Sequence, residues 1–161
     1  MYLIILGIST GILCGVWTFV APLIALSVWG GFAGTTTYFA SGKHGLEGIG
    51  VAIRCNLAGI ACGMSMMFLT NLFAFSGGGA VASAIISAVM CFLGLWKYTP
   101  FVPGIFLGCF TTFAANGDWL LLGSSVILGA ILGYGCDASG TWAYNKYFAK
   151  NDVVENSEEV N

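Results

Sequence analysis

The chain has 161 residues, of which 58% are hydrophobic and only 7% are charged, with a formal net charge of −2. A soluble domain carries about a quarter charged residues, so this chain lacks the charged side chains that would cover a soluble surface. It also offers no basic surface for nucleic acid. The composition therefore predicts a membrane protein whose main partner is the lipid bilayer, with no nucleic-acid partner.

Long stretches of the chain contain no Asp, Glu, Lys or Arg. They cover residues 1–42, 55–96, 98–117 and 119–136. An uncharged apolar run of about 18 or more residues is a candidate transmembrane helix, and two of these runs are roughly twice that length. The first residues lack the basic segment and the cleavage site of a signal peptide, so we expect the first span to be retained.

Proline, glycine and polar residues divide these stretches into six expected spans. In chain order the spans cover about residues 3–21, 23–42, 46–73, 80–96, 101–115 and 119–142. Pro22 suits the first turn of the second span, where a helix does not need the missing N–H. The predicted fold class is all-α, a polytopic transmembrane bundle over residues 1–149, followed by an acidic, disordered tail over residues 150–161.

The lysines outside the spans indicate the orientation. Lys43 follows the second expected span, Lys97 follows the fourth, and Lys146 and Lys150 lie at or beyond the end of the sixth. The other three connections contain no Lys or Arg. Because cytoplasmic segments carry an excess of Lys and Arg, this distribution predicts that both termini are cytoplasmic.

The two halves of the chain, about residues 1–76 and 77–149, show a weak internal similarity. A shift of 74 positions places Gly30 on Gly104, Phe32 on Phe106, Gly34 on Gly108 and Thr37 on Thr111, and residues 57–63 also resemble residues 127–133. Each half has three expected spans, so the halves would enter the membrane in opposite directions, as in many transporters. Alternatively, the glycines serve only close helix packing, and the threonines bond to their own helices.

The second and fifth spans match in this comparison, and both contain the glycines and prolines typical of broken helices. We therefore predict a solute path between them. The candidate path residues are Trp17, Trp29, Thr36, Thr37, Tyr38 and Phe39 in the first half, and Phe106, Thr111, Thr112, Phe113 and Asn116 in the second. Asp118 and Trp119 are expected at an outer rim.

Two ionisable residues fall well inside expected spans, away from their ends, where such groups are functional candidates. Arg54 lies in the third span and Asp137 in the sixth, both in the half expected to be cytoplasmic. They form a candidate ion pair. Alternatively, Arg54 extends to the headgroups and Asp137 lies at a frayed helix end.

The sequence contains no constellation typical of an enzyme. The serines lack a histidine base, no carboxylate pair is spaced for acid–base chemistry, and there is no phosphate-binding loop. His44 is the only histidine, and the six cysteines form no C-x-x-C motif. We expect no catalytic site, no cofactor and no metal site.

Three segments of the chain resemble a known family. Residues 11–40, 101–119 and 139–143 are similar to the YcdZ-like bacterial inner-membrane proteins, the domain of unknown function 1097. The resemblance covers nearly the whole chain and implies a multi-pass protein of the bacterial cell inner membrane. It carries no assigned activity.

Two functional hypotheses follow. The first is a channel or facilitative transporter for a small neutral or weakly acidic solute. One chain or several could form the path, and we expect a homo-oligomer. The second is a structural or accessory membrane protein that packs against a partner through its small-residue faces and transports nothing itself.

Overall fold

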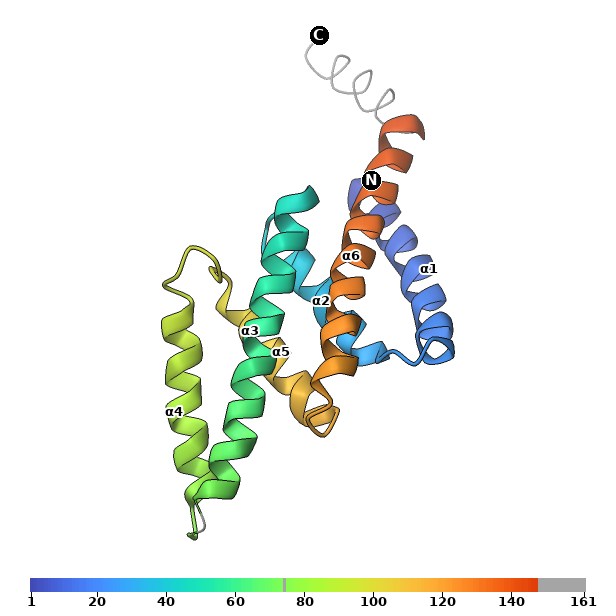
Figure 1. Ribbon diagram of the computed structural model, residues 1–161. Helices are drawn as coiled ribbons and strands as arrows, with labels where there is room; N and C mark the ends of the chain where they lie inside the picture. Colours follow the sequence, from blue (N-terminus) through green and yellow to red (C-terminus); the bar gives the residue numbers. More distant parts are fainter. Residues whose placement is uncertain (74, 148–161) are drawn as a thin grey trace.

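The computed structural model describes residues 1–73 and 75–147, and within them the chain is all-α (Figure 1). The helices are α1 (Tyr2–Leu23), α2 (Val28–Ala40), α3 (Gly45–Leu72), α4 (Gly78–Leu93), α5 (Val102–Ala114) and α6 (Trp119–Tyr147). The all-α prediction is confirmed. The predicted tail over residues 150–161 lies outside the described residues.

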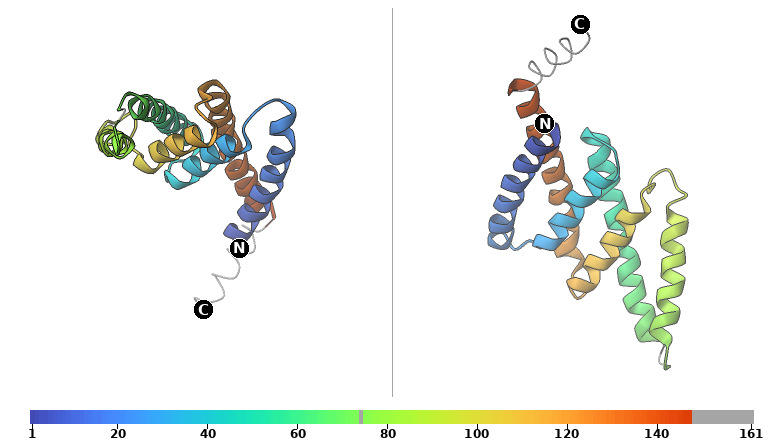
Figure 2. Two further views of the ribbon diagram at one scale, coloured as in Figure 1. Left: turned by 90° about the horizontal axis from the view of Figure 1, so that it is seen from below. Right: turned by 180° about the vertical axis from the view of Figure 1, so that it is seen from behind.

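Two long helices form the centre of the bundle. α3 and α6 lie next to each other, and α2 and α5 cover one side of this pair, α2 chiefly against α6 and α5 chiefly against α3 (Figure 2). α1 packs along the outer side of α6, and α4 packs along the outer side of α3 (Figure 1). The short helices therefore lie against the central pair, and α1 and α4 form the flanks.

Glycines permit the close approach of these helices. A Cβ atom on Gly34 of α2 would collide with the main-chain oxygen of Val126 in α6. A Cβ atom on Gly108 of α5 would collide in the same way with the main-chain oxygen of Asn56 in α3. Small residues at helix contacts bring backbones together where lipid supplies no hydrophobic driving force, so these contacts define the two tightest helix pairs.

The helix bounds agree with five of the expected spans to within a few residues, but the second span was placed wrongly at its start. Pro22 lies inside the last turn of α1, and α2 begins only at Val28. The connection includes Ala25 with a φ of 53°, and Ser27 then caps α2 by accepting a hydrogen bond from the Gly30 N–H at 3.1 Å. A proline near a helix end disturbs only the preceding turn, so α1 continues through it.

Within the part of the chain that the structure describes, three helices are long and apolar enough to cross a membrane, namely α1, α3 and α6. The other three are 13 to 16 residues long, which is shorter than the roughly 20 residues of a full span. Large apolar side chains such as Leu3, Ile12 and Phe92 are exposed on the outer helices. This surface fits contact with lipid.

The connections gather at two ends of the bundle. The start of α1, the end of α6, the α2–α3 connection and the α4–α5 connection lie at one end, which we call the terminal end (Figure 1). The α1–α2, α3–α4 and α5–α6 connections lie at the opposite end (Figure 1). Lys43, Lys97 and Lys146 therefore share the terminal end.

Candidate functional site

A buried carboxylate organises the polar contacts near the terminal end. The Tyr38 hydroxyl donates a hydrogen bond to Asp137 Oδ2 at 2.8 Å, and His44 Nδ1 lies 2.9 Å from the same oxygen. The Tyr38 hydroxyl also accepts a hydrogen bond from the Gly45 N–H at 3.0 Å. Asp137 is only 9% exposed and Tyr38 is fully buried. The three side chains therefore tie together the end of α2, the start of α3 and the inner face of α6.

Two glycines make room for the tyrosine ring. A Cβ atom on Gly133 of α6 would lie 2.9 Å from Tyr38 Cβ, and one on Gly48 of α3 would lie 2.7 Å from the Tyr38 ring. Gly133 and Asp137 are four residues apart, so they share one face of α6. The ring thus passes over the glycine and reaches the carboxylate one turn further along the helix.

The structure does not bring the predicted pair of Arg54 and Asp137 together. Arg54 is exposed on the outer face of α3, and its guanidinium lies about 3.8 Å from where a Cβ atom on Gly50 would be. It therefore folds back by one turn toward the terminal end, as a snorkelling side chain does. Within residues 1–73 and 75–147, the ion-pair partner of Asp137 is His44.

A groove between α2 and α5 contains some of the predicted path residues. It has a volume of about 290 Å³, and Trp29 and Thr36 from α2 face Thr111 from α5 across it. Trp29 and Thr36 are exposed, and Thr111 donates to the main-chain oxygens of its own helix. No hydrogen-bond partner of the Thr36 hydroxyl is found among the described residues.

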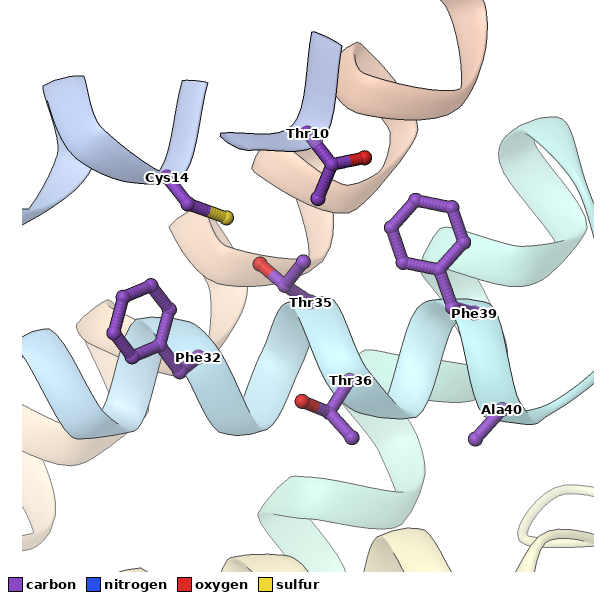
Figure 3. A pocket seen from close by; sticks show the side chains of 7 residues that line it. All are labelled: Thr10, Cys14, Phe32, Thr35, Thr36, Phe39 and Ala40. Atoms are coloured by element: carbon purple, nitrogen blue, oxygen red, sulfur yellow. The ribbon is translucent and has the colours of Figure 1, made fainter. Parts of the chain in front are cut away.

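A second cavity adjoins this groove between α1 and α2. It has a volume of about 490 Å³, and Phe32 and Thr36 line both spaces. Thr10 and Cys14 of α1 project toward α2 (Figure 3). Most of the cavity surface is apolar, and the Thr35 hydroxyl donates to the Gly129 oxygen at 2.8 Å.

The remaining predicted path residues of the first half are part of the packing. Trp17 is buried against Gly31, and its indole N–H donates to the Val28 oxygen at 3.3 Å. Phe39 packs edge to face against Tyr38. Thr37 is fully buried, and no partner for its hydroxyl occurs in the described part of the chain.

The predicted residues of the second half are scattered. Phe106 lines a small cavity between α4 and α5, whereas Phe113 is exposed. Thr112 is buried, and its hydroxyl donates to the Gly108 oxygen at 2.9 Å. Asn116 lies in the α5–α6 turn with a φ of 51°.

The predicted rim residues lie at the start of α6, where Asp118 directly precedes the helix and Trp119 is its first residue. Asp118 and Trp119 are both exposed at the opposite end of the bundle. Asp118 Oδ1 accepts a hydrogen bond from the Leu121 N–H at 3.0 Å, so it caps the helix.

Sequence reasoning missed two polar features. His44 was considered only as a possible metal ligand, although a buried carboxylate such as Asp137 requires donors and His44 is the single histidine of the chain. Asn56 is fully buried near the start of an uncharged stretch, where its amide nitrogen donates to the Ala52 oxygen at 2.8 Å. Its Oδ1 has no partner within the described residues. A single amide within an apolar run was the sequence signal that could have identified this buried polar residue.

These features define a helical membrane protein with a buried polar cluster at one end. The family model described as "Protein of unknown function (DUF1097)" matches residues 7–141, and the chain belongs to this family. The chain is 38% identical over 141 residues to the inner membrane protein YcdZ of Escherichia coli strain K12, covering 87% of this chain and 86% of that protein.

A second relative gives the same result. The chain is 35% identical over 141 residues to the inner membrane protein YcdZ of Salmonella typhimurium strain LT2, covering 87% of this chain and 88% of the relative. No solved structure matches the chain. The family resemblance inferred from the sequence is confirmed, and the chain is an inner-membrane protein.

Proposed function

We propose that the protein is a channel or facilitative transporter for a small neutral or weakly acidic solute. The observation that carries this proposal is the groove between α2 and α5, in which Trp29, Thr36 and Thr111 combine an apolar wall with hydroxyl groups. A hydroxyl on a lipid-facing surface contributes little to stability, because lipid tails cannot form a hydrogen bond with it. A passing solute would supply the missing partner of Thr36.

We further infer an inverted arrangement of two three-helix halves in which all six helices would cross the membrane, and repeated glycine contacts support it. Shifts of 74 residues from α2 to α5 and of 70 residues from α3 to α6 relate four pairs of glycine contacts. In each pair, a glycine of one half and its counterpart in the other half approach corresponding residues. On α2 and α5, Gly30 approaches Ser125 as Gly104 approaches Cys55, and Gly34 approaches Val126 as Gly108 approaches Asn56. On α3 and α6, Gly59 approaches Ile105 as Gly129 approaches Gly31, and Gly63 approaches Thr112 as Gly133 approaches Tyr38. A groove between repeat-related helices is where such proteins place their solute path.

The groove is open on its outer side, so a homo-oligomer completes the proposed path. Trp29 and Phe110 at its margins are 71% and 67% exposed. A second copy covering these rings would exclude lipid and enclose the hydroxyls. Both termini are cytoplasmic in this proposal, because the terminal end carries Lys43, Lys97 and Lys146.

Flux through proteoliposomes tests the proposal. Purified protein is reconstituted, and the uptake of a panel of small neutral and weakly acidic solutes is followed by stopped-flow light scattering. Thr36→Val keeps the shape of the side chain and removes its hydroxyl, so flux should fall by about tenfold. Thr18→Val on α1, an exposed threonine that bonds to its own helix, is the matched control. Absence of flux for every solute, or equal flux in the two variants, contradicts the proposal.

A structural or accessory role is the second candidate. Gly7, Gly11 and Gly15 recur on one face of α1, and nothing described lies within 4 Å of a Cβ atom placed on any of them. Such a face allows a further helix to pack closely. A stoichiometric partner that copurifies with the protein, together with absence of flux, would favour this role over transport.

A further inference from the structure

A cavity beside Asp137 opens at the terminal end of the bundle, between α1 and α6. Its volume is about 490 Å³, which falls in the range of small-molecule sites. Its walls include the rings of Tyr2, Tyr134 and Trp142, and His44 and Asp137 supply its ionisable groups.

The carboxylate in this cavity has an unused acceptor. Both hydrogen bonds from Tyr38 and His44 go to Asp137 Oδ2. No partner of Oδ1 is found within residues 1–73 and 75–147, although the residue is 9% exposed. No Lys or Arg is among the described residues that line the cavity. The carboxylate therefore offers Oδ1 as an acceptor that none of the described residues lining the cavity occupies.

The aromatic walls suit a cation. Ring faces attract ammonium groups, most strongly for tryptophan. At Trp142 this attraction already operates within the chain, because Lys146 Nζ lies 4.7 Å from the ring centroid. Tyr134 is 40% exposed, so its ring is available to a ligand that enters from the terminal end, whereas at Trp142, which is 60% exposed, such a ligand would compete with Lys146.

A metal ion fits this site poorly. Ca²⁺ takes about six to eight oxygen ligands, and Mg²⁺ needs a near-ideal octahedron. Asp137 is the only carboxylate among the described residues that line the cavity, and the described residues contain no group of three or more His, Cys, Asp or Glu that could hold a metal. An organic cation needs only one counter-charge and apolar walls.

We propose that this cavity binds a small organic ammonium ion, with Asp137 as the counter-charge and the rings of Tyr134 and Trp142 as its walls. The site is separate from the groove between α2 and α5. Binding at this cavity can therefore be measured whether or not the groove conducts a solute.

Choline is a suitable probe, because 3,3-dimethylbutan-1-ol has the same shape and no charge. The full chain is placed in nanodiscs, and binding of radiolabelled choline is measured by scintillation proximity. We expect saturable binding that the neutral analogue does not displace. Asp137→Asn, which keeps the size of the side chain, should weaken binding by at least about tenfold. Asp118→Asn at the other end of α6 is the matched control and should leave binding unchanged.

The aromatic walls provide a test that does not depend on the buried carboxylate. Trp142→Leu and Tyr134→Leu alter exposed positions, so the fold should persist, and each should weaken choline binding by roughly threefold to tenfold. If Asp137→Asn does not fold, these two variants decide whether the cavity binds choline. Absence of saturable binding, equal displacement by the neutral analogue, or unchanged affinity in the variants that fold would overturn the proposal.

Discussion

Replacement of Gly34 by alanine should destabilise the protein, because it separates α2 from α6. The added Cβ atom would meet the Val126 oxygen and would lie 2.7 Å from the Ala130 nitrogen. These are main-chain atoms of a helix, so they cannot rotate away as the end of a side chain can. The two helices must move apart, and the neighbouring contacts lose dispersion energy with them.

The magnitude follows from two opposing terms. Overpacking a tight contact costs typically about 1–3 kcal/mol, and a contact between backbones belongs at the upper end of that range. Alanine improves helix propensity over glycine by about 1 kcal/mol. The free energy of unfolding should therefore fall by about 2 kcal/mol in Gly34→Ala.

Gly11→Ala on α1 is the matched control. Nothing described lies within 4 Å of its added Cβ atom, so only the propensity term acts and stability should rise by up to about 1 kcal/mol. Gly108→Ala, whose Cβ atom meets the Asn56 oxygen, should match Gly34→Ala if the two halves are repeats.

Reversible unfolding by sodium dodecyl sulfate in mixed micelles, followed by tryptophan fluorescence, measures these differences. The reasoning fails if Gly34→Ala and Gly11→Ala have the same stability, because the helices would then not be in close backbone contact. A large loss in Gly34→Ala with none in Gly108→Ala would refute the proposed equivalence of the halves.

Substitutions at three further positions test the polar groups. Tyr38→Phe removes a donor to Asp137 and the acceptor for a main-chain N–H, so the same unfolding assay should show a loss of about 1–3 kcal/mol; no loss would mean that the cluster is not formed. Asn56→Leu replaces a buried amide whose Oδ1 is unpaired among the described residues, and stability should change by less than about 1 kcal/mol; a larger loss would indicate a bound water or partner. Asp118→Ala removes the cap of α6 and should cost about 1 kcal/mol, whereas Asp118→Asn should restore most of it.

The number and approximate position of the helices followed from the sequence. An uncharged apolar segment cannot leave its backbone groups unpaired in lipid, so it forms a helix almost regardless of its neighbours. Polar and glycine-rich interruptions then mark the ends, as residues 76–79 and 116–118 do. The start of α2 was missed because the local effect of Pro22 is compatible with either end of a helix.

The contacts between helices were decided only by the tertiary structure. Whether Gly34 faces α6, and whether Asp137 meets Arg54 or His44, depends on how each helix is rotated and paired. Uniformly apolar helices carry little periodic signal for that rotation, because lipid and protein interior are equally apolar. The sequence by itself thus determined a helical membrane protein, and the packing of glycine faces decided which polar groups meet inside it.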